Sequence, residues 1–224
     1  MNPYKVVEEF ENELAAYTGA PYVVTVTSCT MALLLAVAWH LRHERHTRQA
    51  VMENDPQSFY KLSRTAIEIP KHTYIGVPMS IIHAGGRPVF RADSWTGAYQ
   101  LAPLPVFDSA RRFTGGMYVR GQVQCVSFHH TKTLGLAAHG GAILLDDPEA
   151  DRWLRRARFD GRTEGIPPQH DLFDMLGWHC YMTPATAAEG LMRLSTLPDH
   201  NEPLPWGPGT NSDYPDLSQF PIFK

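Results

Sequence analysis

Short apolar runs alternate with helix-like segments along most of this chain, and this alternation is the feature that most limits its fold. Each run is a few residues long and is bounded by Gly, Pro or Asp, which is typical of strands buried on both faces of a mostly parallel sheet. The pattern predicts an α/β fold with a three-layer α/β/α architecture and a mostly parallel sheet. The predicted strands are Tyr22–Val26, Ala66–Ile69, Pro88–Phe90, Leu104–Phe107, Val123–Phe128 and Ala142–Leu145, and the predicted helices are Phe10–Tyr17, Met31–Arg42, Arg152–Arg158 and Ala185–Leu194.

The composition narrows the class of protein. The 224 residues are 43% hydrophobic, which is enough for one good core. Lys and Arg number 20 against 23 Asp and Glu, so the net charge of −3 gives no overall basic signature for nucleic acid. The N-terminus is acidic where a signal peptide needs positive charge, and hydroxyl residues interrupt the apolar stretch 21–39. Three cysteines lie far apart in sequence, as in chains with reduced thiols. We therefore expect a soluble, cytoplasmic protein with no membrane or nucleic-acid partner.

Residues able to carry chemistry follow three of the predicted strands. Ser28 follows the first strand, Asp108 ends the Leu104–Phe107 strand, and Ser127 and Lys132 come at or after the end of the next one. Open α/β sheets bind ligands beyond the carboxyl ends of their strands, so we expect these side chains at one edge. A lysine amine can form a Schiff base with pyridoxal 5'-phosphate (PLP), and a carboxylate can hold the pyridine nitrogen protonated. The pair of Lys132 and Asp108 therefore indicates a PLP site.

Two neighbouring features fit such a site, and each also has an ordinary structural explanation. Ser28-Cys29-Thr30 precedes the Met31 helix, where free N–H groups and hydroxyls can bind a phosphate. Ser and Thr also cap helices where nothing binds. Gly140-Gly141 could let the backbone pass close to the site or to a partner subunit, or could form a plain turn before the next strand.

Five stretches of the chain, in this order, are similar to segments of a known family. They span residues 8–197 at near family spacing and resemble the DegT/DnrJ/EryC1/StrS sugar aminotransferases, which are fold type I PLP-dependent enzymes. The stretches are Phe10–Gly19, Val24–Leu33, Ile69–Tyr74, Val106–Ala110, and Ser127–Lys132 with His139–Ala142 behind it.

This resemblance implies a homodimeric PLP-dependent aminotransferase that forms an internal aldimine on Lys132. The amino group would pass from a small-molecule donor to a keto acceptor, and the family's usual acceptor is a nucleotide-linked keto sugar. By the same resemblance, Ser127 and the Ser28–Thr30 turn reach the phosphate, Tyr74 stacks on the cofactor ring and Lys132 is the base. In isolation, Tyr74 could equally be a half-buried tyrosine with a hydrogen-bonded hydroxyl. The segments implied near the dimer contact are Gly177–Met182 and Gly140-Gly141.

Three features depart from the family pattern. Arg111 stands where the family has glutamine, and a cation there would shift the pKa of the Schiff base or bind a substrate carboxylate. Gly177-Trp178-His179 stands where the family has Gly-aromatic-Asn. The family continues into a small C-terminal domain, whereas residues 201–224 are proline-rich and read as an extended tail. The expected organisation is a PLP-binding large domain over 1–200, with a polar insertion at 43–64, followed by a tail over 201–224.

Several alternatives stay open at this point. The same cofactor residues suit a decarboxylase or dehydratase acting on an amino-acid-derived or modified-nucleotide substrate, and a truncated, non-catalytic PLP-fold protein is the third candidate. The basic run Arg152–Arg158 is either a solvated helix face or a site for a nucleotide diphosphate. His43–His46 and His129-His130 lack the spacing of a zinc site, although the second pair could contact substrate or cofactor. The tail either wraps a partner subunit through apolar anchors or is disordered.

Overall fold

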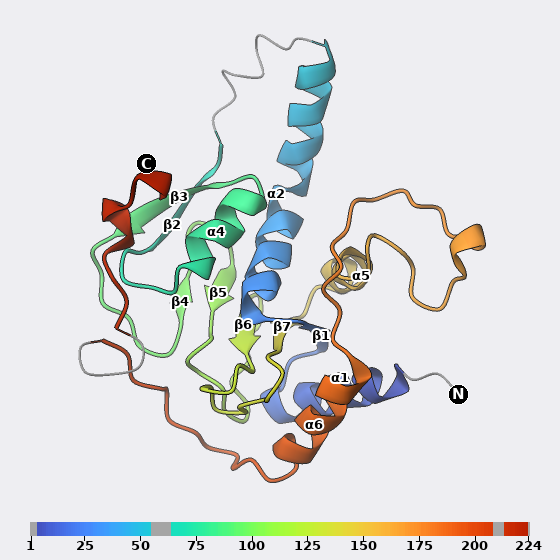
Figure 1. Ribbon diagram of the computed structural model, residues 1–224, viewed down its shortest axis with the longest axis vertical. Helices are drawn as coiled ribbons and strands as arrows, with labels where there is room; N and C mark the ends of the chain where they lie inside the picture. Colours follow the sequence, from blue (N-terminus) through green and yellow to red (C-terminus); the bar gives the residue numbers. More distant parts are fainter. Residues whose placement is uncertain (1–3, 55–63, 208–212, 224) are drawn as a thin grey trace.

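The computed structural model describes residues 4–54, 64–207 and 213–223 (Figure 1). A five-stranded sheet forms its centre, in the order β1-β7-β6-β5-β4. Strands β1, β5 and β6 run in the same direction, whereas β7 lies between β1 and β6 and is antiparallel to both. The carboxyl ends of β1, β5 and β6 therefore meet at one edge, as the sequence predicts. The bounds are β1 Tyr22–Val26, β4 Tyr99–Gln100, β5 Val106–Asp108, β6 Val123–Ser127 and β7 Gly141–Leu145.

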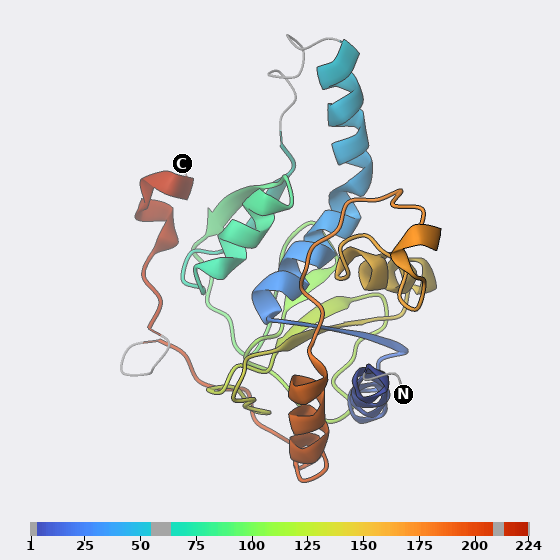
Figure 2. The ribbon, with the colours of Figure 1, turned by 45° about the vertical axis from the view of Figure 1, so that its right-hand side comes forward.

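Helices cover both faces of this sheet, which confirms the three-layer architecture. The strand pairing differs from the expected mostly parallel sheet, because β5–β6 is parallel whereas β1–β7, β6–β7 and β4–β5 are antiparallel. Alternate strand residues point to opposite faces, so Val24 packs in one core with α2, α4 and α5, and Val23 packs in the other core with α1 and α6. Helices α1 and α6 lie side by side, as Figure 2 shows. The bounds are α1 Lys5–Thr18, α2 Cys29–Asn54, α4 Gly76–His83, α5 Pro148–Ala157 and α6 Pro184–Leu194, with short 3-10 turns at η1 Pro168–His170, η2 Leu217–Gln219 and η3 Pro221–Phe223.

Two further strands, β2 (Ala66–Pro70) and β3 (Arg87–Arg91), form a parallel pair beside the main sheet. A single bridge between Glu68 and Ala102 joins this pair to the segment between β4 and β5. All six predicted strands are confirmed to within two residues at each end. Strand β4 and helix α4 were not predicted: β4 has only two residues, and α4 begins beside Pro78 in an apolar stretch without helical periodicity.

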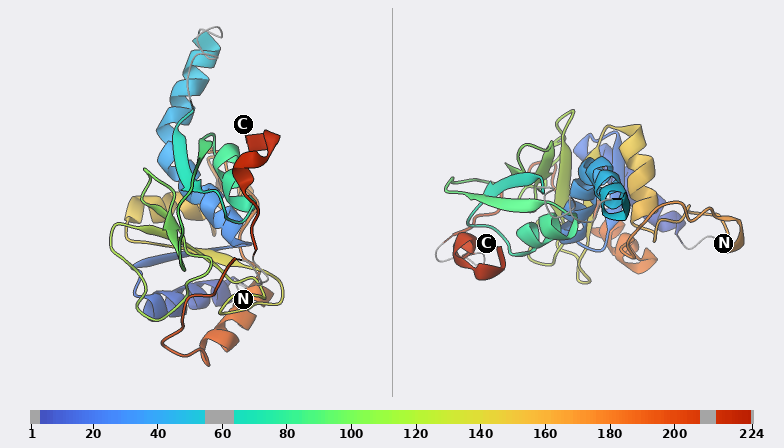
Figure 3. Two further views of the ribbon diagram at one scale, coloured as in Figure 1. Left: turned by 90° about the vertical axis from the view of Figure 1, so that its left-hand side faces the viewer. Right: turned by 90° about the horizontal axis from the view of Figure 1, so that it is seen from above.

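Helix α2 extends well beyond its predicted end at Arg42. It continues to Asn54 and projects away from the rest of the described chain (Figures 1 and 3). The first part of the predicted polar insertion is therefore helical, and residues 55–63 of that insertion lie outside the described residues. None of the helices in the described ranges is both long enough and apolar enough to cross a bilayer.

The C-terminal segment, defined as residues 201–207 and 213–223, packs against its own chain. Residues 213–223 lie beside the β2–β3 pair (Figures 1 and 3), and residues 201–207 contact the loop after β5. Its contacts include an ion pair between Lys71 and Asp216 at 2.8 Å and an aromatic contact between Phe90 and Phe223. Leu217 is 1% exposed. The interpretation of the tail as a disordered end therefore does not fit its described part. Phe220 is 42% exposed, and the interpretation of the tail as an arm that wraps a partner subunit stays a prediction.

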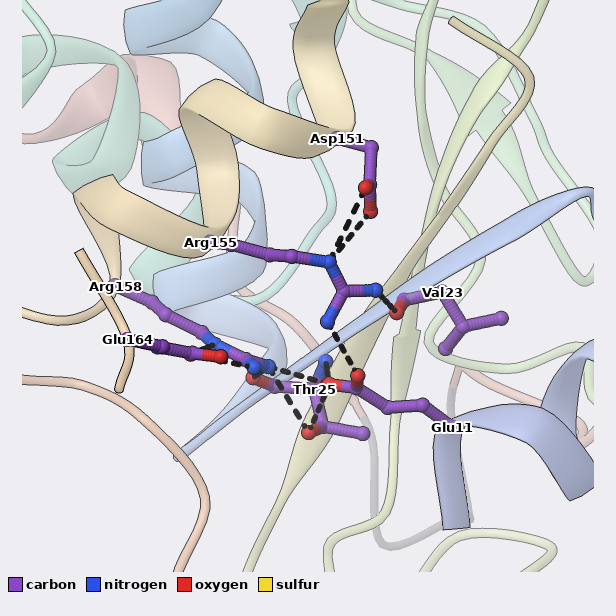
Figure 4. A network of polar contacts seen from close by, with 7 residues as sticks. All are labelled: Glu11, Val23, Thr25, Asp151, Arg155, Arg158 and Glu164. Atoms are coloured by element: carbon purple, nitrogen blue, oxygen red, sulfur yellow. Dashed lines mark hydrogen bonds and ion pairs between the residues drawn. The ribbon is translucent and has the colours of Figure 1, made fainter. Parts of the chain in front are cut away.

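A buried ion network joins α1, β1 and α5 (Figure 4). Glu11 Oε1 accepts from the backbone N–H and the hydroxyl of Thr25 at 2.9 and 2.8 Å, and also from Arg158. Its Oε2 accepts from Arg155 at 2.6 Å, and Arg158 also donates to Glu164. Arg155 and Arg158 of the basic run are thus engaged with Glu11, so these two arginines neither form a solvated face nor are free to bind a nucleotide diphosphate. Burial raises the pKa of Glu11, but the charges of Arg158 and Arg155 outweigh it and hold that pKa below its usual value.

Glu11→Gln is expected to destabilise the fold by about 3 kcal/mol, because two buried guanidinium groups would lose their counter-charge. In a chain of this size that corresponds to a fall in Tm of roughly 10 °C. Because the folded pKa of Glu11 is depressed, its contribution is present above the unfolded pKa and is lost as the pH falls through the folded pKa. Thermal melts at neutral and acidic pH measure this. Glu13→Gln, an exposed position on the same helix, should melt like the wild type at both pH values; equal Tm values for the two variants would contradict the prediction.

Candidate active site

A cavity of about 530 Å³ opens at the edge of the sheet where β1, β5 and β6 end. All eight residues predicted for the site line it, although they come from distant parts of the chain. The predicted lining residues are Ser28, Cys29, Thr30, Tyr74, Asp108, Arg111, Ser127 and Lys132, and further lining residues include Thr73, Trp95, His129, His139, Gly140 and Tyr214.

The turn from β1 into α2 provides hydrogen-bond donors to this cavity. Ser28 caps the helix, because its Oγ accepts from the N–H of Met31 at 3.2 Å. The N–H groups of Cys29 and Thr30 find no acceptor within the described residues, so the cap and an anion site are compatible here. Gly141 lies directly under the turn: a Cβ on this glycine would lie 2.5 Å from the backbone nitrogen of Cys29. The interpretation of this glycine as a point of close backbone approach is confirmed.

Asp108 ends β5 and is held by two donors. Its Oδ1 accepts from the N–H of Ala110 at 2.9 Å, and its Oδ2 accepts from the hydroxyl of Tyr99 at 2.8 Å, which is itself hydrogen-bonded to Thr73 at 2.5 Å. The carboxylate is 4% exposed, and burial raises its pKa. The two hydrogen bonds and the positive charges of Lys132 and Arg111 act in the opposite direction. A buried carboxylate oriented in this way can hold a proton on a neighbouring base.

Lys132 lies in the loop after β6, half-buried in the wall of the cavity. Burial lowers the pKa of its amine, and the positive charge of Arg111 lowers it further, while Asp108 and Cys29 act in the opposite direction. A lowered pKa leaves a larger fraction of the amine neutral, and only the neutral amine can attack a carbonyl carbon or take up a proton.

Arg111 lines the cavity and also binds the C-terminal segment. It is 6% exposed, and its Nε donates to the carbonyl of Leu204 at 3.0 Å while its Nη2 donates to the carbonyl of Pro205. Its Nη1 lies 3.5 Å from the hydroxyl of Tyr214. The interactions shown for Arg111 therefore hold the C-terminal segment, and its charge affects the pKa of Lys132 across the wall.

Sequence reasoning missed several lining residues. Trp95 lies in a loop without a motif, and Tyr214 lies more than eighty positions beyond Lys132. Thr73 and Thr131, which are adjacent to the predicted residues Tyr74 and Lys132, could have been found, because adjacent residues of a loop often share a site. The rest depend on tertiary contacts that no local pattern reveals.

Three histidines gather at the mouth of the cavity. The rings of His129 and His130 lie 4.1 Å apart, and those of His129 and His139 are stacked at 4.8 Å. Burial, His130 and His139 together lower the pKa of His129. In the described part of the chain, no group of three His, Cys, Asp or Glu side chains is arranged to hold a metal ion.

The fold is similar to that of solved PLP-dependent aminotransferases of fold type I, and Lys132 and Asp108 line one cavity at the edge of its sheet. The chain belongs to the DegT/DnrJ/EryC1/StrS aminotransferase family, whose model matches residues 1–106 and 111–203. A comparison with curated proteins finds no significant match.

Solved structures of similar fold agree with this class. An aminotransferase of the DegT DnrJ EryC1 StrS type from Brucella abortus is 20% identical with a TM-score of 0.65, and DesV from S. venezuelae, solved with a ketimine intermediate, is 22% identical with a TM-score of 0.63. The alignments cover 87% and 86% of this chain but 59% and 57% of those proteins. A third match, ntda from Bacillus subtilis with bound cofactor PMP, has 17% identity, a TM-score of 0.62 and coverage of 86% of this chain and 48% of that one. The chain therefore spans less than two thirds of the length of these proteins.

The residues present fit PLP. An amine with a lowered pKa, a buried carboxylate held by two donors and a helix N-terminus with open N–H groups line the same cavity. These are the groups that an aldehyde, a pyridine nitrogen and a phosphate each require.

Proposed function

We propose that this chain carries the active site of a PLP-dependent aminotransferase that moves an amino group from a small-molecule donor to the keto group of a nucleotide-linked sugar. The observation that carries the proposal is that Lys132 and Asp108 line one cavity together with the Ser28–Thr30 turn. Membership of the family supports the reaction class. The nucleotide-linked acceptor is the finer part of the proposal and rests on the family's usual substrate.

Each proposed residue has one task. Bound PLP supplies an electron-withdrawing ring that stabilises negative charge on the carbon bearing the amino group. Lys132 would hold the cofactor covalently and would move a proton between the substrate and cofactor carbons. Asp108 holds a proton on the pyridine nitrogen. The Ser28–Thr30 turn and Ser127 donate hydrogen bonds to the phosphate, and Tyr74, which is 55% exposed on the cavity wall, offers its face to the ring.

The rival activities receive less support from the contacts. A decarboxylase or dehydratase acting on an amino-acid-derived substrate was favoured because Arg111 could bind the substrate carboxylate. The guanidinium of Arg111 donates hydrogen bonds to carbonyls of the C-terminal segment.

The three buried free thiols, Cys29, Cys125 and Cys180, suit a reducing compartment, so we propose that the protein works in the cytoplasm.

The experiment that tests the proposed reaction is a half-reaction. Protein loaded with PLP is incubated with glutamate, then with other amino acids, and the release of pyridoxamine phosphate is measured by chromatography against a protein-free control. We expect stoichiometric conversion with at least one amino donor. Loss of carbon dioxide or ammonia without pyridoxamine phosphate would favour a non-transaminating enzyme instead.

We further propose that the protein is a homodimer whose sites lie near the subunit contact. The segment Gly177–Met182 and the Gly140-Gly141 turn are the proposed contributors, and Gly140 lines the cavity. Light scattering at micromolar concentration should give twice the chain mass of 25.2 kDa. A monomer that binds PLP and turns over would rule out a shared site.

A further inference from the structure

The C-terminal segment reaches the candidate active site from a part of the chain that lies largely beyond the family match, which ends at residue 203. Tyr214 lines the cavity that also contains Lys132. Two sets of contacts, one before Tyr214 and one after it, hold this segment in place.

The first set is centred on Arg111. Besides the bonds from its guanidinium to the carbonyls of Leu204 and Pro205, the backbone N–H of Leu204 donates to the carbonyl of Arg111 at 2.9 Å. This reciprocal pairing fixes the backbone of the segment against the loop that follows β5. A buried guanidinium bound to carbonyl oxygens is costly to release, because water would have to replace each bond.

A series of aromatic contacts connects the C-terminal segment to the carboxylate of Asp108. Tyr99, which donates to Asp108, contacts Trp95 edge-on at 4.7 Å, and Trp95 stacks on Trp206 at 5.0 Å with an angle of 13° between the rings. The indole N–H of Trp206 donates to the carbonyl of Trp95 at 2.7 Å. Trp206 in turn lies 6.3 Å from Tyr214, with the rings near parallel. The segment is therefore packed onto Trp95, which contacts the tyrosine that holds Asp108.

The second set fixes the backbone around Tyr214 itself. His72 Nδ1 lies 2.9 Å from the carbonyl of Tyr214, and Lys71 pairs with Asp216 at 2.8 Å. The N–H of Leu217 donates to the carbonyl of Lys71 at 2.9 Å. The chain is held at Asp216, two residues after Tyr214, and the carbonyl of Tyr214 is itself hydrogen-bonded. The Tyr214 ring therefore has little freedom to move away from the cavity wall.

We propose that Tyr214, held by the Arg111 and Lys71 contacts, is a specificity-determining residue that limits the size of the molecule reaching Lys132. The C-terminal segment is then a wall of the substrate pocket and not an inert tail. This inference rests on the proposed function for its biological meaning, since the molecules it would select are the amino donor and the keto acceptor.

The test measures access to Lys132 in protein without cofactor. Reductive alkylation with cyanoborohydride is run with a small aldehyde, formaldehyde, and with a bulky one, naphthaldehyde, and labelling at Lys132 is followed by peptide mapping. The ratio of the two rates cancels changes in the reactivity of the amine. The same ratio at Lys5, whose side chain is 75% exposed, provides an internal reference.

In Tyr214→Ala we expect the naphthaldehyde-to-formaldehyde ratio at Lys132 to rise about tenfold, because removing the ring lowers the barrier only for the bulky reagent. Arg111→Met should also raise this ratio, since the segment loses its hydrogen bonds with the Arg111 guanidinium. Tyr214→Phe, which keeps the ring, should leave the ratio unchanged. Phe220→Ala, which removes an exposed aromatic from the same segment outside the cavity, should also leave it unchanged.

Each variant must first melt cooperatively near the wild-type temperature, and Tyr214→Leu replaces Tyr214→Ala if that variant does not. A ratio at Lys132 that stays at the wild-type value in folded Tyr214→Ala or Tyr214→Leu would overturn the inference. An equal rise in Phe220→Ala would do the same, because it would show general loosening. The labelling needs no cofactor, so its outcome is separate from a failure of the proposed function, which would show as PLP not becoming attached to Lys132.

Discussion

Lys132→Ala should yield a protein that folds but no longer holds PLP covalently. The wild type, reduced with borohydride in the presence of excess PLP, should carry the cofactor on the peptide that contains Lys132, and the variant should carry none. Turnover should fall by at least about 10⁴-fold, because the covalent anchor and the proton-transferring base are the same side chain. Lysine is required here for its nucleophilic amine, which the cavity keeps partly neutral by lowering its pKa.

Two companion variants make this result specific. Lys132→Arg keeps a positive charge at the position but cannot form the covalent link, so it should behave like Lys132→Ala. Lys5→Ala removes an exposed amine on α1 and should retain both the covalent label and the activity. Label found on a different lysine in the wild type would show that the loop after β6 does not hold the cofactor.

Asp108→Asn should keep PLP bound and reduce turnover by about a thousandfold. The amide has the size of the carboxylate. Its oxygen can still accept from the N–H of Ala110, and its NH2 group can donate to the hydroxyl oxygen of Tyr99, so the fold of the β5 end is preserved. It cannot, however, hold a proton on the pyridine nitrogen, and the ring then withdraws electrons less strongly. Steady-state kinetics measure turnover, and the absorbance of the bound cofactor measures loading.

The control for Asp108→Asn is Asp93→Asn, an exposed carboxylate that pairs with Arg91 away from the cavity, which should retain full activity. Asp108→Glu restores a carboxylate displaced by one methylene and should recover part of the lost rate. Wild-type turnover in Asp108→Asn would mean that a different acid contacts the ring nitrogen.

The strands and the chemistry at their ends were predictable because both are local properties. Apolar runs such as Tyr22–Val26 and Val123–Phe128 are bounded by residues that stop strands, and the observed bounds differ little from the predicted ones. Ser28, Asp108 and Lys132 lie at or shortly after the carboxyl end of a strand, so a shared sheet edge was enough to bring them together. The extension of α2 was not predictable, since a polar stretch without periodicity gives no helical signal.

The roles of charged and aromatic residues depended on partners far away in the sequence. Arg155 and Arg158 read as a solvated basic face, but they meet Glu11 on α1 more than 140 residues earlier. Arg111 was predicted to shift the pKa of the Schiff base or to bind a substrate carboxylate, and the structure adds hydrogen bonds from it to a segment more than ninety residues later. A sequence shows which side chains carry charge, but it does not show which of them are brought within hydrogen-bond distance.

By itself, the sequence determined the fold class, the strand edges and the residue types that can hold PLP, because these follow from short-range patterns of hydrophobicity and from the chemistry of individual side chains. The tertiary structure decided the pKa values of those residues and which side chains enclose them. Burial and the neighbouring Arg111 lower the pKa of Lys132, and Tyr214 completes the cavity wall only because the C-terminal segment folds back onto β2 and the loop after β5. Desolvation and long-range contact are properties of the packed chain, and no local stretch of residues encodes them alone.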